Sequence, residues 1–126
     1  MSAGAALQEA VATGLGSLGM LDGIYDGPPA RAAYPYVALD AGTEVDWSHK
    51  SGRGREITLA VTLWDARADG LQALGDAVEA SVLATGAVAG WQLVSSQLIR
   101  RRVVRDVAGP WAVAIDFRVR LLAASF

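Results

Sequence analysis

His49, the one histidine of this 126-residue chain, is the side chain best suited to acid–base chemistry near neutral pH. Asp46 precedes it by three residues, and Ser48 and Ser51 lie on either side of it. A catalytic histidine needs an orienting carboxylate together with a nucleophile or a bound water. Proximity in sequence does not establish that geometry, so the pattern favours a solvated loop histidine. A small α+β ligand-binding domain or enzyme that uses His49 stays open as an alternative.

The acidic residues follow no metal-binding or glycosidase pattern. Asp22 and Asp26 each precede a glycine, which is typical of turns, and Asp40, Glu44 and Asp46 are scattered. The chain has no cysteine and a single histidine, which excludes thiolate zinc sites and multi-histidine centres. We therefore expect no catalytic residues, no metal and no cofactor, and we interpret the protein as a non-enzyme.

Basic residues gather in two segments. Residues 52–55 (Gly-Arg-Gly-Arg) lack the Gly-Lys-Ser or Gly-Lys-Thr ending of a phosphate loop and precede a predicted strand rather than a helix. The second segment, residues 100–105 (Arg-Arg-Arg-Val-Val-Arg), lies on a predicted strand. Alternation along that strand directs Arg100 and Arg102 to one face and Arg101 and Arg105 to the other. No single basic face results. This run suits an edge strand, on which charge deters unwanted pairing, or a subunit interface with Arg–carboxylate pairs.

Composition places the chain among globular single domains. Hydrophobic residues make up 52% of the sequence, and the net charge is −2, which argues against a dedicated nucleic-acid binder. The first 20 residues lack the early basic cluster of a signal peptide, and no apolar window is long enough to span a membrane. We expect one domain over residues 1–126, made in the cytoplasm and with no membrane partner.

Hydrophobic periodicity predicts two helices, over residues 5–18 and 69–85. Period-two alternation and turn signals predict strands over residues 34–41, 55–65, 91–107 and 111–122. Residues 43–47 can continue the first strand, residues 24–25 can form a short extended piece, and residues 106–110 form a hairpin connection. We predict an α+β two-layer sandwich, with a mainly antiparallel four-stranded sheet and two helices on one face.

The segment 48–54 is polar and glycine-bearing, although it joins two well-defined strands. Such a loop adds little to its own core, so its length indicates contact with another molecule. Trp47 can serve as an aromatic interface residue at the base of this loop. The candidate residues for an interface with another subunit or another protein are Trp47, His49, Lys50, Arg53, Arg55, Arg100 and Arg102.

An ordered series of motifs extends across nearly the whole chain. It comprises a first helix at residues 7–18, Ile-Tyr-Asp-Gly-Pro-Pro at 24–29, Tyr-Pro-Tyr-Val at 34–37, Asp-Trp-Ser at 46–48, Lys50, Gly-Arg-Glu at 54–56, Leu-Trp at 63–64, a helix at 71–85, an Arg-rich strand end, and Trp111-x-Val113-x-Ile115-x-Phe117-Arg118. In this combination the chain resembles the tail terminator or tail-completion family of tailed phages and prophages. It is most similar to the version carried by gene transfer agents of alphaproteobacteria.

This resemblance implies a structural virion protein without catalysis or cofactor. Members of such a family form a homo-hexameric ring at the head-proximal end of the tail tube. The ring ends tube polymerisation and joins the tail to the head-side connector, and DNA passes through its lumen without sequence-specific binding. The implied partners are the tail tube protein on one side and a connector or stopper protein on the other. A stopper or other head–tail connector ring stays open as an alternative.

Overall fold

Two long central strands, β3 (Gly54–Asp65) and β6 (Trp111–Ala123), organise the sheet. The computed structural model of the chain describes residues 2–105, 107 and 109–124. β3 and β6 pair antiparallel along their whole length, with Gly54 opposite Leu122 and Asp65 opposite Trp111. Alternate side chains of both strands are buried on one face: Ile57, Leu59, Val61, Leu63, Val113, Ile115, Phe117, Val119 and Leu121. The alternation in the sequence therefore predicted these two strands correctly.

The strands that flank this pair are β2 (Tyr36–Asp46) and β5 (Trp91–Arg105), and both are antiparallel to their central neighbours. β2 has one extra residue between Asp40 and Thr43, so the predicted strand and its continuation form one bulged strand. β5 has two such bulges, after Leu93 and after Leu98. Asp106 and Ala108 of the predicted hairpin connection lie outside the described residues.

The prediction of a mainly antiparallel four-stranded sheet is wrong. The sheet is mixed and curled, and its six described strands follow the order β1-β2-β3-β6-β5-β4. β1 (Gly23–Asp26) pairs in parallel with β2, and β4 (Ala87–Val88) pairs antiparallel with the start of β5. Both added strands are too short to produce a recognisable alternation, and β1 lies between turn residues. The chain remains α+β overall.

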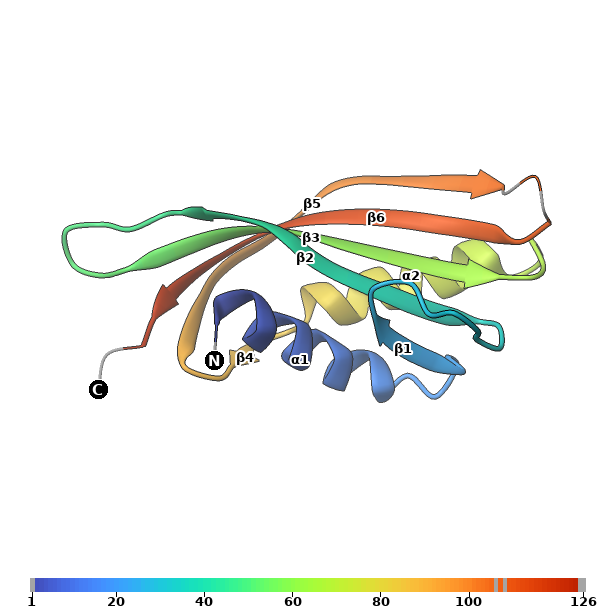
Figure 1. Ribbon diagram of the computed structural model, residues 1–126, viewed down its shortest axis with the longest axis horizontal. Coiled ribbons are helices and arrows are strands. Elements are labelled where there is room, and N and C mark those ends of the chain that lie inside the picture. Colours follow the sequence, from blue (N-terminus) through green and yellow to red (C-terminus); the bar gives the residue numbers. More distant parts are fainter. Residues whose placement is uncertain (1, 106, 108, 125–126) are drawn as a thin grey trace.

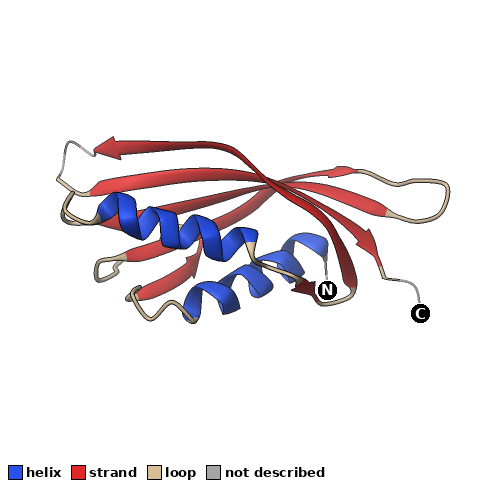
Figure 2. Cartoon of the chain, turned by 180° about the vertical axis from the view of Figure 1, so that it is seen from behind, coloured by secondary structure: helices blue, strands red, loops and turns tan. Residues whose placement is uncertain are grey.

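Two helices, α1 (Ala3–Gly16) and α2 (Leu71–Leu83), lie along the same face of the sheet (Figures 1 and 2). α1 begins earlier than its apolar pattern predicts because Ser2 caps it: the Ser2 Oγ accepts a hydrogen bond of 3.2 Å from the Ala5 amide. α2 begins after Gly70, whose φ of 76° lies in the left-handed region, so the helix starts two residues later than predicted. Both helices end earlier than predicted.

The core lies between the helices and the covered face of the sheet. Leu7, Val11 and Leu15 of α1 and Leu71, Val78 and Val82 of α2 pack against the buried strand residues. Each such fully buried side chain contributes roughly 1.5–3 kcal/mol relative to an exposed one. The opposite face of the sheet carries no helix among the described residues. Neither α1 nor α2 is long enough to cross a membrane.

Candidate assembly surfaces

The hairpin tip between β2 and β3 is more ordered than its polar, glycine-bearing sequence indicates. The Trp47 amide donates to the Gly54 carbonyl (2.9 Å), and His49 and Gly52 exchange hydrogen bonds of 2.8 and 3.2 Å. The two-strand ladder therefore continues to a tight turn at Lys50 and Ser51. The hairpin projects from one end of the sheet (Figure 1). It places the exposed side chains of His49, Lys50 and Arg53 together at this tip.

Polar contacts fix the base of the hairpin. Ser48 Oγ donates to Asp46 Oδ1 (2.6 Å) and accepts from the Gly54 amide (3.0 Å). Arg55 Nε lies 3.5 Å from a Glu44 carboxylate oxygen. The adjoining cavity measures about 180 Å³, below the roughly 300 Å³ at which small-molecule sites begin. The base of the hairpin is thus better suited to a protein contact than to a small ligand.

Trp47 is held by two neighbours at this end of the molecule. The Arg120 guanidinium lies 5.2 Å from the centroid of the Trp47 ring, within cation–π range. The His49 ring meets the Trp47 ring edge-on, at a centroid distance of 4.4 Å and an angle of 77°. His49 is thus an aromatic neighbour of Trp47, and its backbone closes the turn. Within the described residues, no group of three or more His, Cys, Asp or Glu residues is placed to hold a metal.

Replacing His49 by alanine is expected to leave folding and assembly nearly intact. The exposed imidazole contributes one aromatic contact, which is worth about 0.5–1.5 kcal/mol. The measurement is the thermal melt of the variant, with Trp47→Ala as the comparison. A loss of stability in H49A as large as that in Trp47→Ala would contradict this expectation.

Arg100 and Arg102 lie far from the hairpin tip, toward the C-terminal end of β5. Their register partners are Asp116 and Ala114, which places both on the uncovered face of the sheet. Arg100 Nε is 2.8 Å from Asp116 Oδ2. The predicted site residues therefore fall into two separate groups, five at the hairpin and two on β5.

β5 also exposes apolar side chains that the sequence analysis did not single out: Val94, Leu98, Ile99, Val103 and Val104, each 38–47% exposed. In the described part of the chain, β4 pairs only with Trp91 and Gln92, so the rest of β5 has no strand on its outer side. A long, apolar, unpaired edge strand is a ready template for pairing with another chain. The signal available in the sequence was the run of apolar residues interleaved with arginines.

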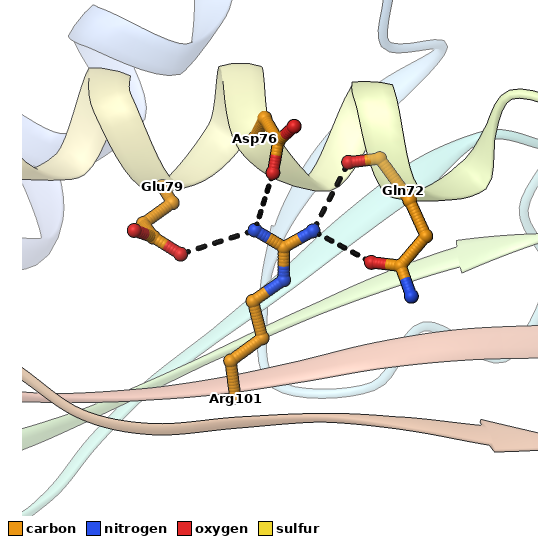
Figure 3. Close-up of polar contacts among 4 residues, drawn as sticks. All are labelled: Gln72, Asp76, Glu79 and Arg101. Carbon is orange, nitrogen blue, oxygen red and sulfur yellow. Dashed lines mark hydrogen bonds and ion pairs between the residues drawn. The ribbon is translucent and has the colours of Figure 1, made fainter.

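Arg101 ties this edge strand to α2 (Figure 3). Arg101 Nη1 donates to Asp76 (2.7 Å) and Glu79 (3.1 Å), and Nη2 donates to the Gln72 carbonyl (3.0 Å) and side-chain oxygen (2.8 Å). The guanidinium lies over Gly75, where a Cβ would come within 2.7 Å of Nη2. Burial alone would lower the pKa of Arg101, but the bonds to Asp76 and Glu79 more than offset this, so its pKa is raised. The side chain stays charged and bonded.

Three tyrosines cluster at the end of the sheet opposite the β2–β3 hairpin. Tyr36 stacks on Tyr34 at 5.7 Å and meets Tyr25 edge-on at 5.8 Å. Burial raises the pKa of the Tyr36 phenol, and Tyr34 and Tyr25 raise it further. The protonated phenol is therefore favoured in the folded state.

Tyr36 is expected to ionise at higher pH than an ordinary tyrosine. Its contribution to stability is complete below pH ~10, where the unfolded phenol is neutral, and is lost as pH rises through the higher pKa of the folded state. Absorbance titration of tyrosinate in the folded protein, compared with Tyr36→Phe, measures this. A titration in which Y36F removes the earliest-ionising phenol would contradict the expectation.

The sequence model of the family described as "Tail completion protein gp17" matches residues 3–122. The chain belongs to the tail completion protein gp17 family. No curated protein matches it. The match confirms the resemblance to phage tail-completion proteins and identifies the chain as a structural component of the tail of a virion particle.

Two solved structures share the fold of this tail completion protein. One is a chain of the "Virion of native gene transfer agent (GTA) particle", with a TM-score of 0.64 and 22% identity over 97% of this chain and 96% of that chain. The other is the "Structure of bacteriophage SPP1 gp17 protein", with a TM-score of 0.63 and 22% identity over 98% and 91%. Both likenesses span nearly the full length, so the overall fold of this chain is shared with both structures.

Proposed function

We propose that this tail completion protein forms a closed ring of six copies at the head-proximal end of the tail tube. There it ends tube polymerisation and joins the tube to the connector below the capsid. The observation that carries this proposal is the unpaired, apolar edge of β5. A chain with different surfaces at its two sides associates head to tail, and such contacts close into a ring when the rotation between copies allows it.

The charge of the protein is compatible with DNA moving through such a ring. The net charge is −2 per copy, so a ring of any size is acidic overall. On the uncovered face of the sheet, Glu56 lies 3.1 and 3.4 Å from Arg118 and Arg120, which offsets part of their charge. DNA affinity depends mainly on cationic contacts to phosphates. A lumen in which carboxylates offset part of the arginine charge would let DNA pass without sequence-specific binding.

The projecting hairpin supplies the surface we assign to the neighbouring tube or neck layer. Lys50 and Arg53 are exposed at its tip, Arg55 is exposed at its base, and Trp47 is held in place behind them. Arginine forks suit carboxylates on a partner. Arg100 and Arg102 belong to a different surface, on β5, where Arg100 pairs with Asp116.

Charge reversal at the hairpin tip is expected to impair tail joining without affecting folding. Lys50→Glu combined with Arg53→Glu changes two exposed side chains and should shift the unfolding free energy by less than about 0.5 kcal/mol. The yield of tailed particles is expected to fall several-fold. Normal yields of tailed particles with normal tail length would show that the hairpin is not an assembly surface.

Removing the protein from the producing strain tests the overall proposal. Without a tail completion ring, tubes should grow beyond their normal length and heads should lack joined tails. A stopper would give a different result, because its loss should leave tails of normal length and heads that release DNA. Electron microscopy of the particles distinguishes the two results. Complementation by the wild-type chain should restore normal tails.

A further inference from the structure

The described sheet has two unpaired edge stretches, one on each of its two sides. On one side, β4 covers only the first two residues of β5, leaving the strand open from Leu93 to its end. On the other side, β1 covers β2 only from Tyr36 to Leu39. The next amide of β2 in need of a partner, that of Ala41, bonds to Gln8 Oε1 of α1 (2.9 Å). The open stretch of β2 therefore runs from Gly42 to Asp46.

These two stretches carry opposite charges. The open part of β5 contains four arginines and no acidic residue. The open part of β2 and the residue before its bulge contain Asp40, Glu44 and Asp46 and no basic residue. Arg101 is already bound to α2, Arg100 pairs with Asp116, and Glu44 pairs with Arg55. The opposite charges of the two edges therefore come mainly from Arg102 and Arg105 on β5 and from Asp40 and Asp46 on β2. Two β5 edges would repel each other, which disfavours a symmetric dimer through this strand and leaves the acidic β2 edge as its complement.

Strand direction is also compatible with this contact. β2 and β6 run one way through the sheet, and β3 and β5 run the other way. Rotation about an axis along the strands preserves these directions, so β5 of one copy meets β2 of the next copy antiparallel. Through β6 and β3, Arg102 is level with Ala38 of β2, two residues before Asp40, so neighbouring copies must be offset along the strands for Arg102 and Asp40 to meet. Tilted strands in closed barrels have such a stagger.

We infer that the open edge of β5 pairs antiparallel with the acidic edge of β2 in a second copy of this chain, so that the sheets join head to tail around the ring. Arg102 and Asp40 lie on the same, uncovered face of the sheet and are the side chains best placed to meet across the junction. Both are exposed. This inference rests on the proposed ring and adds which surfaces meet within it.

Charge reversal tests the pairing through complementation. Arg102→Glu places an acid against Asp40, and Asp40→Arg places a base against Arg102, so each variant alone should yield roughly tenfold fewer tailed particles or worse. Co-expression of the two variants should restore the yield, because alternating copies juxtapose opposite charges at every junction. Arg67→Glu and Asp69→Arg are the matched controls, since both residues are highly exposed and lie between β3 and α2, away from either edge.

Cross-linking gives a second readout that does not depend on charge. The chain has no cysteine, so Arg102→Cys with Asp40→Cys in the same chain introduces a defined pair. Within one copy these residues are three strand spacings apart, about 14 Å, too far for a disulfide. Oxidation of assembled particles should therefore give a ladder of covalent oligomers that ends at the closed ring.

Three results would overturn the inference: single reversals that assemble as well as the controls, folded single variants that co-expression does not restore, or intact tailed particles whose double-cysteine chain gives no ladder. In the last case the tails would still end normally, so the result would contradict the pairing of β5 with β2 but not the proposed ring. Tails of normal length in the absence of the chain would instead contradict the proposed function itself.

Discussion

Alanine at position 54 is expected to lower the free energy of unfolding by about 2–4 kcal/mol. Gly54 is buried at the start of β3, and a Cβ there would overlap the Trp47 carbonyl and lie 3.1 Å from Leu122 Cδ2. The overlapped atoms belong to backbone that also bonds to Gly54, so the hairpin must open to relieve the clash. Urea or thermal denaturation followed by circular dichroism measures the loss.

Gly52, two residues away in the same hairpin, provides the matched control. A Cβ at Gly52 meets no atom within 4 Å, and the residue is not in the left-handed region. Gly52→Ala should therefore leave the free energy of unfolding unchanged or raise it by up to about 1 kcal/mol, because alanine reduces the conformational entropy of the unfolded chain. Equal effects of the two substitutions would contradict the close approach of the chains at Gly54.

Arg101→Met is expected to cost about 2 kcal/mol and to loosen β5 from α2. Methionine keeps most of the apolar stem but removes four hydrogen bonds, and it leaves Asp76 and Glu79 without their shared cation. The Arg101 side chain is only 18% exposed, so solvent screens these contacts weakly. Denaturation measures the cost, and amide hydrogen exchange along β5 measures the loosening.

The neighbouring Arg100 is the control for the Arg101 prediction. Its ion pair with Asp116 is as short, at 2.8 Å, but its side chain is 63% exposed. Arg100→Met should cost no more than about 1 kcal/mol. If Arg101→Met destabilises the protein no more than Arg100→Met, or leaves amide exchange in β5 unchanged, then Arg101 does not hold this strand to α2.

The sequence was most informative where the structure repeats with a regular period. Buried and more exposed residues alternate from Ile57 to Leu63 in β3 and from Val113 to Leu121 in β6, and the apolar spacings of α1 and α2 follow the helical period. The four-residue β1 and two-residue β4 contain too little pattern to be recognised, and β1 pairs in parallel through a crossover that local sequence does not specify. The six-stranded mixed sheet therefore required the structure.

Candidate interface residues show the same division between local and long-range information. The exposed cations of the hairpin and of β5 could be found because charged runs and glycine-bearing loops are local features. The Arg101 contacts could not, because they join residues 22 to 29 positions apart and depend on α2 passing above β5. The open edges of β2 and β5 likewise depend on where β1 and β4 end.

The two bulges of β5 affect how its length can change during evolution. Val94 and Ile99 are extra residues that face no partner on β6. Loss of a codon for either would remove a bulge and leave the remaining side chains on their present faces. Loss of a codon between Arg100 and Arg105 would instead move the side chains on one side of the deletion to the opposite face of the sheet. Insertions and deletions of one residue should therefore be found at these two positions in homologues that retain the same core.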